Sequence, residues 1–311
     1  MKISAYDKDI TDEVKHSKGK VHSVFKSALS IESGGRLITF APASGGKGPG
    51  FFLVEDPQDF RSMGFEPDMP FSVYEDDKYI AIGGRKLSTA NAAGFSSMSD
   101  FSGYSVDGKK IKNNIEYLKK NLVRYVCNDL RCLENSLFPV SAGEYLPEKM
   151  DSSNSCVIPV WNEYVRNALI IMDEGIIDRD ENLFSRSLEK LTGAGCGLTP
   201  GGDDFILGML CISNLITKAG YSKGNSSGLF ILGNIQKYLP LYLNKTGFIS
   251  RSYLQYALEG RYTETLVSFI RMFSDGYPEN SQECISKLMC RGATSGADTI
   301  AGILFASGYL C

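Results

Sequence analysis

The spacing of apolar residues changes once along this chain, near residue 105, and this change restricts the folds that the chain can adopt. In the first part, apolar residues form short runs separated by clusters of Gly, Pro and Asp, which is typical of strands. In the second part, they recur every three or four positions from Ile111 onward, which is typical of amphipathic helices. The sequence therefore predicts an α+β protein, with a β-rich domain over residues 1–105 and a mainly helical domain over residues 106–311.

Each predicted domain has its own set of expected elements. The β-rich domain is expected to form a small antiparallel sheet or barrel. Its strands are expected in Val21–Ile31, Arg36–Phe40, Phe51–Val54, Phe71–Val73 and Tyr79–Ile82. The helical domain is expected to begin with one long helix over about 108–133, followed by a polar, loop-like segment at 141–156. Further helices are expected at 160–175, 182–191, 203–219, 227–241, 248–259, 263–274, 279–290 and 296–308.

The overall composition excludes several classes of function. The chain carries a formal net charge of −3 and has no dense run of Lys and Arg, so no nucleic-acid partner is expected. Its N-terminus lacks the apolar core of a signal peptide, and no apolar run approaches the roughly 20 residues of a membrane span. None of the eight cysteines forms a C-x-x-C pair, which is typical of reduced cysteines. We therefore expect a cytoplasmic protein with no membrane partner.

The scarcity of histidine limits the chemistry that the chain can perform. Only His16 and His22 occur, so a zinc site with several histidine ligands is excluded. A Ser-His-Asp or Cys-His mechanism could use only these two residues. Acid–base chemistry is therefore expected to fall to carboxylates, Lys, Tyr or groups of the substrate.

The most specific feature of the sequence is a turn that occurs twice. Residues Gly197–Asp203 and Gly292–Asp298 share the pattern G-x-T-x-G-x-D, and a strongly apolar segment follows each copy. The first N–H groups of a helix are unpaired within the helix, and the helix dipole favours negative charge there. Two such helix starts facing each other would bind a small anion. The predicted substrate-binding residues are Thr199, Gly201, Gly202, Thr294, Ser295, Gly296 and Asp298.

Two adjacent acids close the first copy of the turn. We expect Asp203 and Asp204 to be catalytic, by orienting a nucleophile, or to hold a magnesium ion, which prefers oxygen ligands. A purely structural interpretation competes with this one, since Asp is ordinary in the first turn of a helix. It applies best to the second copy, where Ser295 to Asp298 forms a capping-box pattern. The first copy, with its paired glycines and paired acids, favours a functional role.

Two positions in the β-rich domain are weaker candidates for substrate binding. Lys47 follows two glycines, but the spacing of a phosphate-binding loop is absent, because Ala41 stands where the first glycine would be. This segment is expected to be a hairpin or loop tip, or else a mobile loop whose Lys47 touches substrate. Arg85 lies in an expected turn at a strand end, and its guanidinium could clamp a carboxylate with two hydrogen bonds.

The repeated turn also carries a resemblance to a known family. Residues Gly197–Phe205 and Gly292–Asp298 resemble motifs of the AllH family, and Val21–Phe25 and Gly48–Gly50 are similar to its N-terminal pattern. The resemblance implies a subunit of oxamate carbamoyltransferase, working with FdrA-type and AllG-type subunits. That enzyme converts oxalurate and phosphate into oxamate and carbamoyl phosphate in the anaerobic use of allantoin. Oxalurate, phosphate and carbamoyl phosphate are small anions, in agreement with the predicted anion site.

Three functions stay open on the sequence alone. In the first, the chain is a carbamoyltransferase subunit whose two turns stabilise the charge that develops as phosphate attacks the carbamoyl carbon. In the second, the chain is a non-catalytic scaffold or regulatory subunit, and both turns are structural. In the third, the chain is a magnesium-dependent phosphotransferase.

Overall fold

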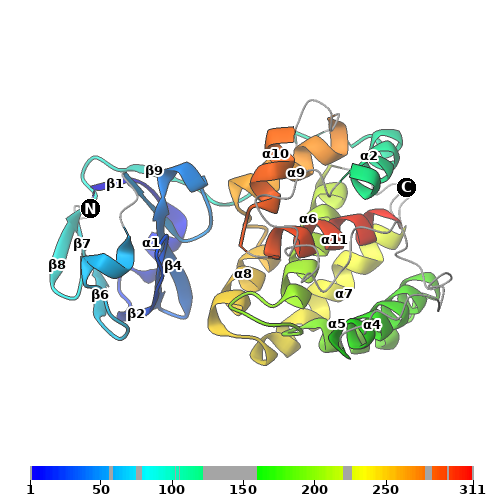
Figure 1. Ribbon diagram of the computed structural model, residues 1–311, viewed down its shortest axis with the longest axis horizontal. Helices are drawn as coiled ribbons and strands as arrows, with labels where there is room; N and C mark the ends of the chain where they lie inside the picture. The colour runs from blue at the N-terminus through cyan, green and yellow to red at the C-terminus, as the bar shows by residue number, and fades with distance from the viewer. Residues whose placement is uncertain are drawn as a thin grey trace. The chain divides into compact units, whose positions relative to one another are not determined.

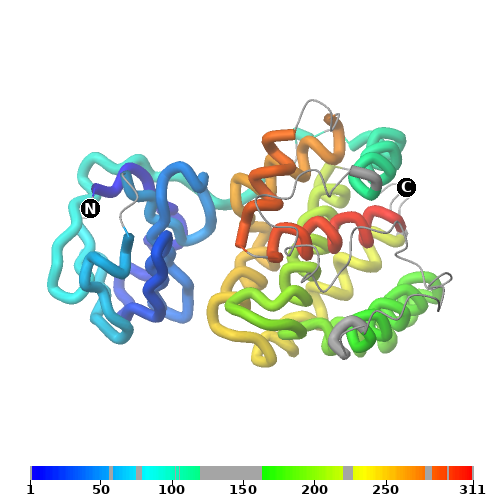
Figure 2. The backbone as a smooth tube through the Cα atoms, viewed as in Figure 1, coloured from blue at the N-terminus to red at the C-terminus, as the bar shows by residue number. Residues whose placement is uncertain are grey.

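The computed structural model describes residues 2–55, 59–74, 79–101, 103–104, 106–121, 160–219, 226–276, 282–292 and 294–309. The chain divides into two units, which are described separately (Figures 1 and 2). The first contains residues 1–99 and a short segment at 261–265, and the second contains 100–260 and 266–311. Strands form the first unit and helices the second, which confirms the predicted α+β class.

Within the described residues, the first unit is built on a nine-stranded sheet with the order β8-β7-β6-β2-β3-β4-β5-β1-β9. Most neighbouring strands are antiparallel, but β4 pairs with β5 in parallel, and so does β1 with β9. The segment that contains Lys47 connects β4 to β5, so it is not the hairpin that the sequence allowed. The strands are β1 Lys2–Asp7, β2 Gly19–Val24, β3 Leu29–Ser33, β4 Arg36–Pro42, β5 Phe51–Glu55, β6 Pro70–Val73, β7 Tyr79–Ile82, β8 Arg85–Ser88 and β9 Ala93–Phe95.

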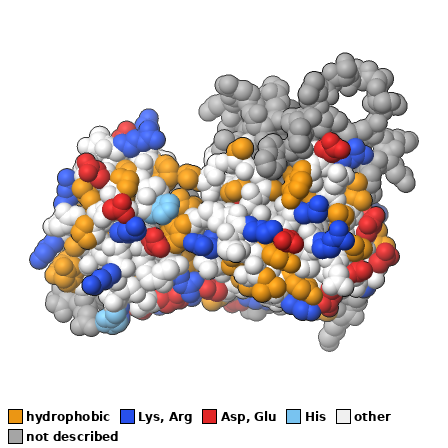
Figure 3. All heavy atoms as spheres, turned by 90° about the horizontal axis from the view of Figure 1, so that it is seen from below, with side chains coloured by type: hydrophobic (Ala, Val, Ile, Leu, Met, Phe, Trp, Pro, Cys, Tyr) orange, Lys and Arg blue, Asp and Glu red, His pale blue; other side chains and the backbone are white. Residues whose placement is uncertain are grey.

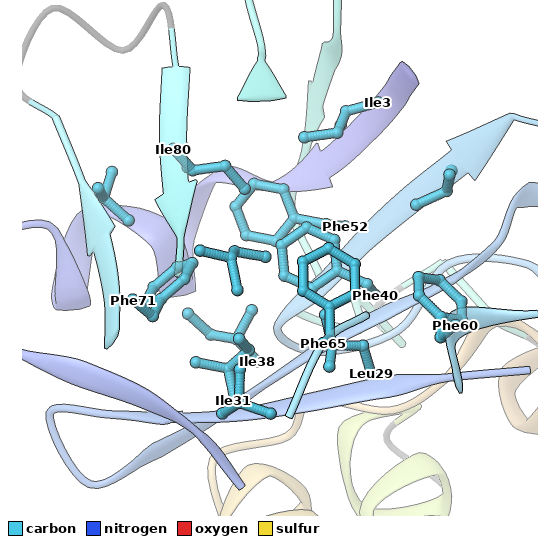
Figure 4. Packing of buried hydrophobic residues seen from close by; sticks show 14 of the residues in the cluster. Ile3, Leu29, Ile31, Ile38, Phe40, Phe52, Phe60, Phe65, Phe71 and Ile80 are labelled. Atoms are coloured by element: carbon cyan, nitrogen blue, oxygen red, sulfur yellow. The ribbon is translucent and has the colours of Figure 1, made fainter. Parts of the chain in front are cut away.

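One face of this sheet carries the apolar core of the first unit (Figure 4). Phe40 and Phe52 are register partners on β4 and β5, and their rings stack with centroids 4.9 Å apart. Because side chains alternate between the two faces of a sheet, the partners Thr39 and Phe51, one position earlier, point to the other face. Asp7 ends β1 and is followed directly by the short helix α1 (Lys8–Val14), which the sequence analysis did not predict.

The second unit confirms the predicted helices to within a few residues. The helices are α2 Gly108–Asn121, α4 Val160–Ile177, α5 Glu181–Leu191, α6 Gly201–Lys218, α7 Ser226–Tyr242, α8 Phe248–Leu258, α9 Glu264–Asp275, α10 Gln282–Met289 and α11 Ser295–Ser307. The second half of the long helix predicted over 108–133 lies outside the described residues, as does the loop-like segment at 141–156.

Helices α6 and α11 pack against each other at the centre of the second unit (Figure 1). A Cβ atom at Gly208 of α6 would lie 2.1 Å from the carbonyl oxygen of Thr299. A Cβ atom at Gly302 of α11 would lie 1.9 Å from the carbonyl oxygen of Phe205. Both distances are too short for any side chain, so glycine at these two positions lets the helices approach backbone to backbone.

The surface charge, the helices and the cysteines each bear on an expectation from the sequence. Figure 3 shows Lys and Arg interspersed with Asp and Glu on the face that it draws. None of the described helices is long and apolar enough to cross a bilayer. Cys196, Cys211 and Cys284 are free, whereas Cys290 is disulfide-bonded, so the expectation of reduced cysteines is wrong for Cys290.

Candidate functional site

The two copies of the repeated turn lie side by side. Thr199 of the first copy and Ser295 of the second are in hydrogen-bond contact, with 2.8 Å between their hydroxyl oxygens. The first copy leads into α6 and the second into α11, so the close packing of these helices brings their N-terminal ends to the same place. The turns are adjacent in space although they are far apart in the sequence.

The glycines of the turns have identifiable steric roles. Gly197 and Gly292, the first residues of the two copies, have φ angles of +95° and +66°, which few other residues adopt. A Cβ atom at Gly202 would lie 2.0 Å from the carbonyl oxygen of Leu191, and one at Gly296 equally close to that of Leu288. Packing against the preceding segments therefore explains Gly202 and Gly296 without a ligand.

Protein carbonyl groups already accept hydrogen bonds from several N–H groups at these helix starts. In α6, Gly202 N donates to Ala194 O at 2.9 Å, and the N–H groups of Asp203 and Asp204 donate to Pro200 O. In α11, the N–H groups of Gly296 and Asp298 donate to carbonyl groups of the segment 291–294. The side-chain hydroxyls of the turns are therefore more important as possible ligand donors than the sequence suggested.

Asp203 is held by protein groups on both carboxyl oxygens. Its Oδ1 accepts from Gly193 N at 2.8 Å, and its Oδ2 accepts from the hydroxyls of Thr246 and Ser250, the latter at 2.7 Å. Burial raises the pKa of Asp203, and these three hydrogen bonds oppose that rise. The carboxylate joins the start of α6 to the loop at 193 and to the start of α8.

Asp204 has different surroundings, although it is the next residue. It is 6% exposed, one of its oxygens interacts with the Ser295 hydroxyl, and its Oδ2 has no hydrogen-bond partner within the described residues. Burial raises the pKa of Asp204 well above its ordinary value, and the nearby Asp298 and Asp203 raise it further. Arg291 and the Ser295 hydrogen bond act in the opposite direction. Asp204 is therefore a buried carboxyl group between the two turns with one oxygen available.

The turns reach the surface above these acids. Gly197, Leu198 and Gly292 are exposed, whereas Thr199, Thr294 and Ser295 are half-buried. Leu198 is 51% exposed, which is unusual for leucine. Asp298 is fully buried in the first turn of α11. The residues that carry the hydroxyl groups of the turns are thus partly accessible, whereas the nearby Asp204 and Asp298 are buried.

Lys47 and Arg85 belong to the first unit, where both interact with protein groups. The backbone of Lys47 is held by Glu264, whose carboxylate accepts from Lys47 N at 2.9 Å and whose N–H donates to Lys47 O at 2.8 Å. The Lys47 ammonium lies 5.6 Å from the centroid of the Phe95 ring. The guanidinium of Arg85 donates to Met63 O and lies over the ring of Phe65.

A buried polar cluster in the first unit was missed by the sequence analysis. Asp7 is fully buried, and its Oδ2 accepts from Gly50 N at 2.9 Å and from the Ser97 hydroxyl at 2.5 Å. Arg261 donates to Ser97 and to Asp9, at 3.2 and 3.3 Å. Burial raises the pKa of Asp7, while Arg261 lowers it. The Gly50 turn was visible in the sequence, but nothing there connected it to Asp7 or to Arg261.

The sequence predicted that Asp203 and Asp204 could hold a magnesium ion. Within the described ranges, no group of three or more His, Cys, Asp or Glu side chains is placed to hold a metal ion. Asp203 also uses both of its carboxyl oxygens for hydrogen bonds to protein. Magnesium often binds through only one or two carboxylates, so its binding at Asp203 and Asp204 stays a prediction, and no step through a metal is derived.

Comparison with known families gives two matches that together cover most of the chain. The sequence model described as oxamate carbamoyltransferase subunit AllH matches residues 191–307, a range that contains both turns. The model of the AllH family N-terminal domain matches residues 2–94, which contain the sheet up to the start of β9. No solved structure matches the chain.

Proposed function

The chain belongs to the AllH family of oxamate carbamoyltransferase subunits, and we propose that it binds a small anionic substrate of that reaction between its two turns. The candidate ligands are oxalurate or oxamate, phosphate, and carbamoyl phosphate. The observation that carries the proposal is the contact of 2.8 Å between Thr199 Oγ1 and Ser295 Oγ. It unites two helix starts, and helix dipoles make such a position favourable for negative charge.

The chemistry of the reaction explains what such a site would do. A phosphate oxygen attacks the ureido carbon of oxalurate, the bond from this carbon to the oxamate nitrogen breaks, and that nitrogen takes up a proton. Negative charge develops on the carbonyl oxygen as the carbon becomes tetrahedral. Donors that are oriented before the reaction stabilise this charge most effectively. A ligand between the turns would replace the hydrogen bond that the hydroxyls of Thr199 and Ser295 now share, so that both could donate to it, with Asp204 beside the ligand and Asp203 positioning α6.

A double variant tests this function. Thr199→Ala/Ser295→Ala would be reconstituted with FdrA-type and AllG-type subunits and assayed for carbamoyl phosphate formed from oxalurate and phosphate. Loss of two aligned donors should lower kcat/KM by about 100-fold or more. Ser307→Ala is the matched control, because its hydroxyl bonds Ile303 O within the same helix α11. A folded double variant as active as the Ser307→Ala control would contradict the proposal.

One observation favours the second candidate, a non-catalytic scaffold or regulatory subunit. Protein carbonyl groups already accept from the N–H groups of Gly202, Asp203, Asp204, Gly296 and Asp298, as structural turns require. In that case oxalurate, oxamate, phosphate and carbamoyl phosphate should leave the melting temperature of the chain unchanged, because a ligand that binds the native state stabilises it. The double variant would then still support full activity of the assembled enzyme.

A further inference from the structure

We infer that Asp204 binds the anion as a neutral carboxylic acid, with the Oδ2 hydroxyl donating a hydrogen bond to an oxygen of the ligand. This inference rests on the proposed function, since it concerns the same site. It adds the protonation state of one residue, and therefore a dependence of binding on pH.

The position of Asp204 supports a role at the ligand. The residue is more than nine-tenths buried in the first turn of α6, and it interacts with the Ser295 hydroxyl of the facing turn. Its Oδ2 has no hydrogen-bond partner within the described part of the chain. Buried polar atoms almost always have a partner, so an available oxygen on a carboxyl group that already contacts the Ser295 hydroxyl indicates a bound group.

The charges around Asp204 decide which protonation state suits an anion. Asp203 faces it from the same helix, Asp298 from α11, and Arg291 from the segment before α11. An ionised Asp204 would add another negative charge to this group, and it would repel the ligand. The neutral acid removes that repulsion and turns an acceptor into a donor. Burial acts in the same direction, because it raises the pKa of Asp204 well above the ordinary range.

Asp203 cannot take the same role. Gly193 N–H donates to its Oδ1, and the hydroxyls of Thr246 and Ser250 reach its Oδ2. Its hydrogen bonds are thus made within the protein, and they hold α6 in place. Asp203 is a positioning residue, and Asp204 is the acid that touches the ligand.

The experiment measures oxamate binding by calorimetry between pH 6 and pH 9, with the full chain alone and in the reconstituted complex. Oxamate is a suitable probe because its carboxylate stays ionised over this range. Wild-type affinity should fall about tenfold or more where the pH passes the raised pKa of Asp204, since one hydrogen bond to a charged group is lost there. Asp204→Asn keeps a neutral donor, so its affinity should stay close to the wild-type value at pH 6 and change little with pH. Asp204→Ala should bind about tenfold more weakly at every pH.

The outcomes separate this inference from the proposed function. If Thr199→Ala/Ser295→Ala weakens binding but Asp204→Asn binds as weakly as Asp204→Ala, the protonated acid is wrong and the site stands. If the double variant binds oxamate like wild type, or if wild type binds none in either form, both are wrong. Thermal unfolding of each variant shows whether it is folded. If Asp204→Ala does not fold, the affinity of Asp204→Asn is compared with that of wild type instead.

Discussion

Asp7 in the sheet unit and Asp204 in the helical unit are both buried aspartates whose pKa is raised by burial. Each also has one carboxyl oxygen without a hydrogen-bond partner within the described residues. Their charged neighbours differ. Asp7 interacts with Arg261, which favours its ionised form, whereas Asp203 and Asp298 beside Asp204 oppose ionisation. A buried aspartate beside a cation, such as Asp7, is thus favoured in its ionised form. A buried aspartate beside other carboxyl groups, such as Asp204, is favoured in its protonated form.

The surroundings of Asp7 have a clear structural purpose. Arg261 is only 9% exposed, and its guanidinium contacts Asp9, Glu13 and Ser97. Through these contacts the segment 261–265 joins the sheet unit, although it follows α8 in the sequence. No comparable cation is buried among the described groups around Asp204, where Arg291 is half-buried.

The largest effect on stability is expected from removing the cation of the Asp7 cluster. Arg261→Met removes a cation that is itself only 9% exposed and that acts on the fully buried Asp7, which should lower the free energy of unfolding by about 3 kcal/mol. Arg291→Met, at the half-buried arginine near Asp204, should cost less than about 1 kcal/mol. Urea unfolding of both variants measures the difference, and equal losses would show that the two clusters do not differ in this respect.

A smaller effect should separate the two aspartates themselves. Asp7→Asn removes the charge that faces Arg261 and buries an amide without an assigned acceptor, so stability should fall by about 2 kcal/mol. Asp204→Asn removes a group that its neighbours disfavour when charged, so stability should stay within about 1 kcal/mol of wild type. The comparison fails if Asp204→Asn proves the more damaging substitution in the same urea experiment.

The smallest effect is expected in the dependence of stability on pH. A raised pKa means that the folded chain binds the proton more tightly than the unfolded chain, so this contribution is complete below about pH 4 and declines as the pH rises toward the folded pKa. The excess stability of wild type over Asp204→Asn should therefore be greatest at acidic pH and shrink above it. Asp7→Asn should give a weaker trend, because Arg261 opposes the rise of the Asp7 pKa. Unfolding curves at several pH values test this, and parallel curves for wild type and Asp204→Asn would contradict it.

The helices show how far sequence reasoning reached. An apolar face that repeats every three or four residues is a local property, so α4 to α11 were predicted almost to their ends. Strands β1, β8 and β9 and helix α1 were missed because their residues show no clear apolar pattern, and the single run predicted over Val21–Ile31 is two strands, β2 and β3. The parallel pairing of β4 with β5 could not be predicted, because strand pairing depends on contacts outside the strand itself.

At the candidate site too, the sequence revealed the local motif but not the contacts that its residues make in the folded chain. The repeated turn was visible as a motif, and its family resemblance was confirmed by the match over residues 191–307. The different environments of Asp203 and Asp204 were not visible, since neighbours in sequence gave no sign of which oxygens would find partners. Only the packing of α8 and of the loop at 193 decides that Asp203 is fully bonded and Asp204 is not.

By itself, the sequence determined the order of the helices α4 to α11, the family, and the presence of two matched helix starts, because each is encoded in patterns within a few turns of chain. The tertiary structure decided that these starts meet, because their contact depends on α6 and α11 approaching at Gly208 and Gly302. It also decided that Asp7 lies beside Arg261. Charges and hydrogen bonds act through space, so only the folded chain determines which groups lie close enough to change one another's protonation.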